Sequence, residues 1–163
     1  MKIFTTELQN ALKGKAYYAA ILLALTLPDV CSALESANGA STPETYKNWY
    51  EKWLGPQYPT VTGADIYFLR CSVAHQAAFN HPAMQVKKVY FTLPTGLLIY
   101  DQNEDEHGLQ LDLIRFCKSM AEAVDRWYSA KGNTPEVEKN IKRMFRFLPD
   151  IENAFIKGVR GIG

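Results

Sequence analysis

The stretch from Thr62 to Asn80 constrains the fold more than any other part of the chain. On a helix, Ile66, Leu69 and Val73 fall on one continuous apolar stripe, and the rest of the circumference offers no broad polar face. Such a helix is usually enclosed by other helices or by a partner chain. We therefore expect a helical bundle built around this segment, in which its single arginine and single histidine require partners.

Length and composition fit one globular domain spanning 1–163. Hydrophobic residues make up 47% of the chain and charged residues 21%, values that argue against disorder and against a fibrous repeat. The formal net charge of +1 gives no global attraction for nucleic acid. Any nucleic-acid binding would therefore depend on a local basic patch.

The cysteines and one apolar run indicate a cytoplasmic protein that does not enter a membrane. Cys31, Cys71 and Cys117 are an odd number without a close pair, which is typical of reduced core thiols. The apolar run Ala16–Leu27 follows two lysines and loosely resembles an export signal, but it is too short to span a bilayer. We interpret it as part of a core helix.

Helical periodicity covers most of the remaining chain. Pro28 is expected to kink or restart the second helix, because proline lacks a backbone donor. Thr42 and Thr134 each precede a proline at an expected helix start. The expected helices are a short one capped by Thr5 or Thr6, then Lys15–Ser36, Pro43–Leu54, Ile114–Lys131, Pro135–Phe147 and a last turn over 151–159.

A stripe of aromatic residues lies along the expected Pro43–Leu54 helix. Tyr46, Trp49, Tyr50 and Trp53 recur at spacings of three and four. This spacing is more typical of a core face than of a platform on which nucleic-acid bases stack. We therefore predict that the stripe is packed inside the bundle.

Between the helices, the period changes to that of strands over about 86–112. Val86–Leu93 and Gly96–Tyr100 have strand composition and are separated by turn residues, which predicts an antiparallel hairpin. An acidic loop, Gln102–Gly108, follows, and alternating leucines at 109, 111 and 113 suggest a third strand. The predicted fold is mainly α, with a hairpin or three-stranded sheet inserted.

Common catalytic and metal-binding signatures are absent from the sequence. It has no phosphate-binding glycine loop, HExxH or GxSxG motif, and its histidines are not at metal-ligand spacing. We expect neither a metal nor a cofactor. Cys71 and His75 are one helical turn apart, so a Cys/His nucleophile is conceivable, although a buried thiol is the more common outcome at such a position.

Arg70 and His75 form an RxxxxH pattern within the apolar helix. This pattern, together with the order of helices, resembles the HEPN superfamily (higher eukaryotes and prokaryotes nucleotide-binding domains). The resemblance implies a homodimer whose cleft is lined by both motif residues. Many family members are metal-independent ribonucleases, which makes His75 and Arg70 the candidate catalytic residues, with RNA as the ligand. Such proteins serve bacterial defence, toxin-like or mobile-element systems, so an antitoxin-like partner is also expected.

The proposed chemistry suits these two side chains. An imidazole titrates near neutral pH and can transfer the proton of a 2′-hydroxyl, while a guanidinium can stabilise charge on the phosphate. On one helix, however, Arg70 and His75 are about 140° apart. A twofold dimer would relieve this separation, because one cleft can receive residues from both copies.

Four residues are candidates to support the motif. Asp29 and Glu35 could each direct a carboxylate at Arg70; alternatively, Asp29 is a favourable charge at a helix N-terminus and Glu35 lies on a solvated face. Cys71 and Ser72 follow the motif arginine directly, and Cys71 stands where many family members carry a polar residue, often asparagine.

Two alternatives remain open for the motif and for the basic residues near the end of the chain. Arg70 and His75 could instead form a structural polar network in a non-catalytic, dimeric HEPN-like interaction module. The basic residues would lie on or near one face of the Pro135 helix. They are either a solvated face or the surface that contacts the phosphate backbone, and comprise Lys139, Lys142, Arg143 and Arg146.

Overall fold

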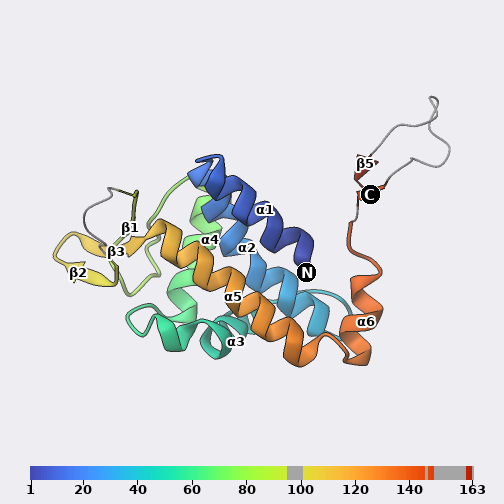
Figure 1. Ribbon diagram of the computed structural model, residues 1–163. Helices are drawn as coiled ribbons and strands as arrows, with labels where there is room; N and C mark the ends of the chain where they lie inside the picture. Colours follow the sequence, from blue (N-terminus) through green and yellow to red (C-terminus); the bar gives the residue numbers. More distant parts are fainter. Residues whose placement is uncertain (95–100, 146, 149–160, 163) are drawn as a thin grey trace.

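The computed structural model describes residues 1–94, 101–145, 147–148 and 161–162, and it is mainly helical with a small mixed sheet (Figure 1). The helices are α1 Lys2–Lys13, α2 Tyr17–Glu35, α3 Pro43–Trp53, α4 Gly63–Gln76, α5 Leu113–Lys131 and α6 Pro135–Ile141, with a 3-10 turn at Gly55–Gln57. The strands are β1 Val89–Thr92, β2 Asn103–Asp105, β3 Gly108–Asp112, β4 Phe147–Leu148 and β5 Gly161–Ile162. The predicted fold class is confirmed.

Helix α2 is the centre of the bundle, because it packs against each of the other five helices. Its Ala24, Leu25 and Cys31 have no exposed surface. We expected the Thr62–Asn80 segment to hold this position, but α4 packs mainly on α2 and α3 and ends at Gln76. Both segments are apolar around most of their circumference, so periodicity alone does not decide which one is enclosed.

Pro28 lies inside α2 without ending the helix. Proline supplies no N–H to the carbonyl four residues earlier and crowds the preceding turn. One turn before Pro28, the carbonyl oxygen of Leu25 accepts a hydrogen bond of 2.7 Å from the hydroxyl of Tyr46. Tyr46 is fully buried on α3, so this bond ties α3 to α2 next to the proline.

The aromatic stripe on α3 is largely packed inside the bundle, as predicted. Tyr46, Trp49 and Tyr50 are buried, and Trp53 is half-buried. The Trp49 ring lies edge-on to Trp127 of α5, with ring centroids 6.5 Å apart. The stripe therefore joins α3 to α2 and to α5.

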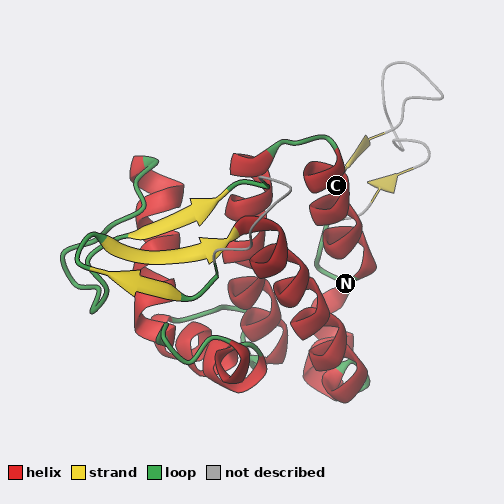
Figure 2. Ribbon diagram, turned by 60° about the vertical axis from the view of Figure 1, so that its left-hand side comes forward, coloured by secondary structure: helices red, strands yellow, loops and turns green. Residues whose placement is uncertain are grey.

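The sheet has the order β1-β3-β2 and lies at one end of the bundle (Figure 2). β1 pairs in parallel with β3, and β2 with β3 forms an antiparallel hairpin. The acidic stretch that we expected to be a loop contains β2. The predicted strand at 96–100 lies outside the described residues, and the predicted third strand is confirmed as β3. The hairpin of the described part is thus β2–β3.

Two residues fix the turn of this hairpin. The Asp105 carboxylate accepts backbone hydrogen bonds from His107 and Gly108, and these bonds hold the pKa of Asp105 below its usual range. Gly108 has φ +147°, and a side chain there would meet the carbonyl oxygen of Lys88 at 2.4 Å. Only glycine fits this close approach. The hairpin therefore depends on this Asp–Gly pair.

The two ends of the chain differ from the sequence expectation. Helix α1 begins at Lys2, so Thr5 lies inside it, where its hydroxyl donates to the Lys2 carbonyl, instead of capping it. Helix α6 ends at Ile141 and not at Phe147, and it is followed by turn-type hydrogen bonds. Phe145 packs edge-on against Phe4, which draws the chain away from the helix axis. The turn expected over 151–159 lies outside the described residues.

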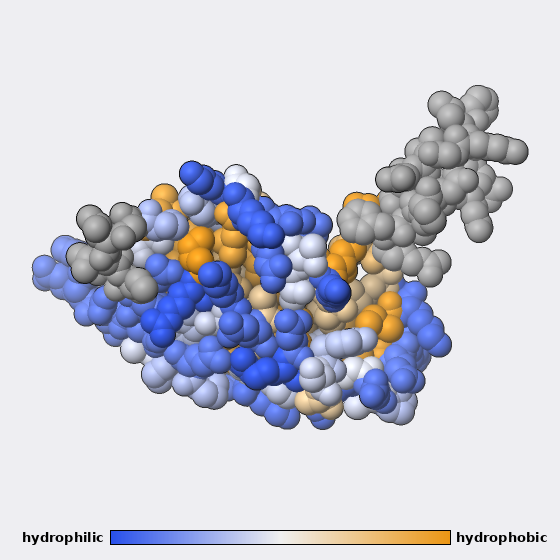
Figure 3. All heavy atoms as spheres, viewed as in Figure 1, coloured by the Kyte–Doolittle hydropathy of each residue, from blue (hydrophilic) through white to orange (hydrophobic). Residues whose placement is uncertain are grey.

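The face in Figure 3 is mainly hydrophilic, with hydrophobic residues around a hollow of about 470 Å³ between α1 and α5. Within the described part of the chain, α2 alone has the length and hydropathy to cross a membrane. Half of its most apolar window is buried by protein, as in a core helix. The described residues thus carry no clear membrane-protein signal.

Candidate functional site

Helix α4 carries both motif residues, and its start is fixed by a capping box. The Thr62 hydroxyl accepts from the Asp65 amide at 3.1 Å and donates to the Asp65 carboxylate at 2.5 Å. Asp65 is 1% exposed and also accepts from the Gln85 amide at 2.6 Å, so it joins the helix start to the loop after the helix. Glu51 of α3 accepts from the Gly63 amide. These bonds fix the start of α4 directly after Thr62.

Arg70 forms an ion pair with Asp29 of α2. Nη2 of Arg70 lies 2.5 Å from Oδ2 of Asp29, and the two side chains are 26% and 22% exposed. Partial burial lowers the pKa of Arg70, but the Asp29 carboxylate and the Cys71 sulfur outweigh it and raise the pKa above its ordinary value. Arg70 therefore stays charged while remaining partly open to solvent.

Cys71 and Tyr67 border the same ion pair. Nη1 of Arg70 lies 3.9 Å from the Cys71 sulfur. Partial burial and the neighbouring Cys71 thiol raise the pKa of the Tyr67 hydroxyl. We had not identified Tyr67 from the sequence, although its spacing of three residues from Arg70 and four from Cys71 places it beside both. The cluster of Asp29, Tyr67, Arg70 and Cys71 is called the Arg70 cluster below.

The three cysteines are free thiols in different environments. Cys71 is half-buried, whereas Cys31 and Cys117 are buried. Burial raises the pKa of Cys31 well above its ordinary value and that of Cys117 to about 12, so both remain protonated at neutral pH. Ser72, predicted as a supporting residue, is fully buried next to Cys71, and its hydroxyl has no hydrogen-bond partner among the described residues.

His75 lies apart from the Arg70 cluster. It occupies the last turn of α4 and is exposed, without a hydrogen bond or ion pair in the described part of the structure. We expected His75 to require a partner inside an enclosed helix, but the helix ends at Gln76 and Ala77 adopts a left-handed conformation. Among the described residues of one copy, no hydrogen bond or ion pair thus joins His75 to Arg70 or Cys71.

Glu35, the second candidate carboxylate, does not reach Arg70. It accepts a hydrogen bond from the indole N–H of Trp127 on α5, at the end of α2. Asp29 and Glu35 are six residues apart, or more than one and a half helical turns, so they leave α2 at different heights. Asp29 alone pairs with the motif arginine.

The basic residues near the end of the chain are exposed but do not share one helix face. Lys139 lies in α6, Lys142 is the C-cap residue directly after the helix, and Arg143 follows Lys142. Nη1 of Arg143 donates to the Asn38 carbonyl oxygen, 3.5 Å away. Arg146 lies outside the described residues. Helix α6 stands at the end of the molecule opposite the three-stranded sheet (Figure 1). Helix α6 also carries acidic side chains, because Glu136 and Glu138 lie in its first turn, so its surface is not uniformly basic.

In the described ranges, no group of three or more His, Cys, Asp or Glu side chains is placed to hold a metal ion. The Arg70 cluster instead combines a cation, the carboxylate paired with it, a thiol and a phenol.

In comparisons with known proteins, no family model matches this chain, and no curated protein or solved structure is significantly similar to it.

Proposed function

We propose that the protein is an HEPN-like, dimeric RNA-binding protein that cleaves RNA without a metal ion, using Arg70 and His75. The observation that carries the proposal is that both motif side chains lie at the surface of one helix. Arg70 is held in place by Asp29 and remains 26% exposed, and His75 is exposed. In a single chain, neither side chain is buried in the hydrophobic core, so both remain accessible to a ligand.

The separation of the two residues on α4 favours a site formed by two copies. Arg70 faces Asp29 on α2, whereas His75 lies at the free end of the helix. In a twofold dimer, the Arg70 of each copy would lie in a common cleft with the two histidines. An isologous interface, in which both copies use the same surface, would form such a site from two chains.

The proposed reaction needs one proton acceptor and one proton donor. One His75 takes the proton of the ribose 2′-hydroxyl, whose oxygen then attacks the adjacent phosphorus. The bond from phosphorus to the 5′-oxygen breaks, and the second, protonated His75 donates a proton to that oxygen. The products are a 2′,3′-cyclic phosphate and a 5′-hydroxyl. Arg70 stabilises the charge on the phosphate oxygens.

The test is RNA cleavage in the presence of a chelator, with purified full-length protein. The wild type should produce fragments with cyclic phosphate ends, and His75→Ala and Arg70→Ala should each reduce the rate by at least about 100-fold. His107→Ala is the matched control, because His107 is an exposed histidine in the β2–β3 turn. A wild type inert on every RNA offered, or a His107 variant as defective as the His75 variant, would contradict the proposal.

A second function is favoured by one observation, the ion pair itself. The Asp29 carboxylate already occupies Arg70, as in a polar network that joins two helices. In this alternative, the protein is a non-catalytic interaction module, and the motif contributes to stability or to dimerisation. Analytical ultracentrifugation separates the two cases. Loss of the dimer or early melting in Arg70→Ala, with wild type and variant equally inert on RNA, would select the interaction module.

A further inference from the structure

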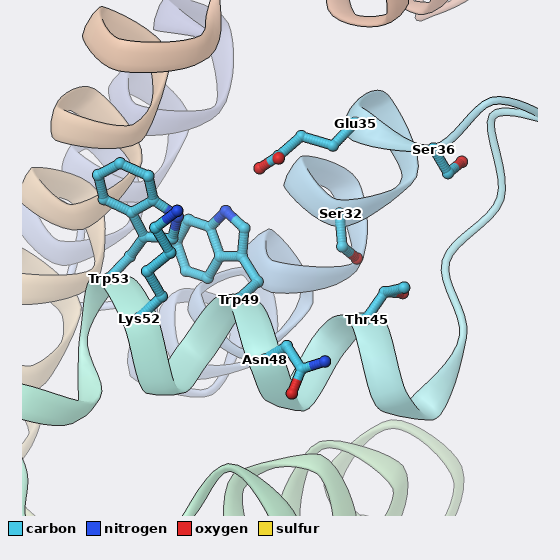
Figure 4. A pocket seen from close by; sticks show the side chains of 8 residues that line it. All are labelled: Ser32, Glu35, Ser36, Thr45, Asn48, Trp49, Lys52 and Trp53. Carbon is cyan, nitrogen blue, oxygen red and sulfur yellow. The ribbon is translucent and has the colours of Figure 1, made fainter.

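A small hollow between the end of α2 and α3 is lined by the Glu35 carboxylate, the Lys52 ammonium group and the indole N–H of Trp49. It has a volume of about 230 Å³ and contains Glu35 on one side and Trp49, Lys52 and Trp53 on the other (Figure 4). Sites for drug-sized ligands usually have about 300–1,000 Å³. The hollow is therefore sized for a fragment such as one amino acid and not for a whole dinucleotide.

The negative group of the hollow is held rigidly. The indole N–H of Trp127 donates to Oε1 of Glu35, so one carboxylate oxygen is fixed and the other remains available. Glu35 has no ion pair within the described part of the chain. A carboxylate with one oxygen still available is a favourable partner for an ammonium group.

The positive group lies on the opposite wall. Nζ of Lys52 is 5.2 Å from the centre of the Trp53 ring, and no carboxylate of the described residues pairs with it. A lysine over an indole face is stabilised only modestly at an exposed position. Its flexible side chain can therefore turn toward an anion that enters the hollow.

The third group is the indole N–H of Trp49. Trp49 is 4% exposed, and its Nε1 is buried without a hydrogen-bond partner among the residues that the structure describes. In Figure 4 this nitrogen points toward the side of the hollow where Glu35 lies, and the Lys52 side chain passes beside it. A buried donor without a partner is costly. A ligand carboxylate between Lys52 and Trp49 would satisfy both.

We propose that this hollow binds a small zwitterion of the amino-acid class, with its ammonium group on Glu35 and its carboxylate between Lys52 and Trp49. Two charges of opposite sign on facing walls select a ligand that carries both charges. A purely cationic ligand is opposed by Lys52, and a purely anionic one by Glu35. The site shares no residue with the Arg70 cluster, so it stands whether or not the protein cleaves RNA.

The test is a binding screen on the full-length wild type with the proteinogenic L-amino acids, one at a time. Thermal shift and quenching of tryptophan fluorescence identify a binder, and titration calorimetry then gives its affinity. The N-acetyl and carboxamide derivatives of that amino acid lack one charge each, so both should bind at least about 10-fold more weakly. Guanosine monophosphate, which is not an amino-acid zwitterion, is included as a competing probe.

Variants then assign the two charges. Glu35→Gln keeps an oxygen that can accept from Trp127 and should weaken binding by about 10- to 100-fold, as should Lys52→Met. Glu44→Gln, an exposed carboxylate at the start of α3, should bind as the wild type does. Circular dichroism confirms that each variant is folded. The proposal is overturned if no amino acid binds, if the uncharged derivatives bind equally well, if guanosine monophosphate alone binds, or if folded Glu35 and Lys52 variants retain full affinity.

Discussion

The hydroxyl of Tyr46 offers a sharp test of how α2 tolerates a proline in its middle. Tyr46→Phe removes one oxygen and leaves the ring, so core packing is preserved. The lost hydrogen bond is 2.7 Å long, fully buried, and directed at the Leu25 carbonyl, one turn before Pro28. A buried bond of this kind contributes about 1–1.5 kcal/mol, and somewhat more if the carbonyl is left without a second partner.

Tyr18 supplies a matched control for this change. Its hydroxyl also donates to a backbone carbonyl, that of Val73, and also at 2.7 Å, but the side chain is 46% exposed. Water can replace that bond, so Tyr18→Phe should cost less than about 0.5 kcal/mol. For a chain of this length, Tyr46→Phe should lower the melting temperature by roughly 2–6 °C.

The assay is urea unfolding followed by circular dichroism, with both variants and the wild type at neutral pH. Burial raises the pKa of Tyr46 well above its ordinary value, so its hydroxyl is protonated under these conditions and no titration complicates the comparison. Equal destabilisation by Tyr46→Phe and Tyr18→Phe would refute the reasoning, because burial would then not distinguish the two bonds. A more stable Tyr46 variant would refute it as well.

Three further changes probe other parts of the fold. Asp65→Ala removes the buried carboxylate that joins the start of α4 to the following loop, and it should cost about 2–4 kcal/mol in urea unfolding; a cost below that of an ordinary surface substitution would contradict this role. Asp29→Asn should cost about 1–2 kcal/mol, and a double-mutant cycle with Arg70→Met should show favourable coupling, whereas zero coupling would mean that the ion pair contributes nothing. Burial raises the pKa of Tyr58 to about 12, above its ordinary value near 10. The protonated Tyr58 hydroxyl therefore contributes fully to stability below about pH 10, and this contribution decreases as the pH rises toward 12. Tyr58→Phe should make the loss of stability between about pH 10 and pH 12 smaller, and an unchanged dependence of stability on pH would contradict this.

Local signals in the sequence predicted where α3 begins and how it packs. Thr42 and Thr62 each sit three residues before a side chain that returns the hydrogen bond, and both capping boxes are present. The aromatic stripe on α3 is buried because its spacing of three and four places it on one side of the helix. These features depend on residues within one helical turn of each other, so the local sequence is sufficient to predict them.

Other features depend on contacts far apart in the chain, and these were missed. The parallel pairing of β1 with β3 joins Val89 to Leu109, and strand composition does not specify such a partner. His75 is exposed because α4 ends at Gln76, whereas the sequence pattern had suggested a helix that continues to Asn80. Asp29 was correctly proposed as a partner of Arg70, yet Glu35 had equal standing, because sequence does not tell which turn of α2 faces α4.

The position of α2 among five helices has a consequence for measurements of amide hydrogen exchange. Detachment of α2 would remove a packing partner from each of the other five helices. Amides in the middle of α2 should therefore exchange with solvent only when the whole molecule opens, and their protection should equal the global free energy of unfolding. Amides of α6, a short helix at one end, should exchange through smaller openings, so one experiment would rank the parts of the molecule by the order in which they come apart.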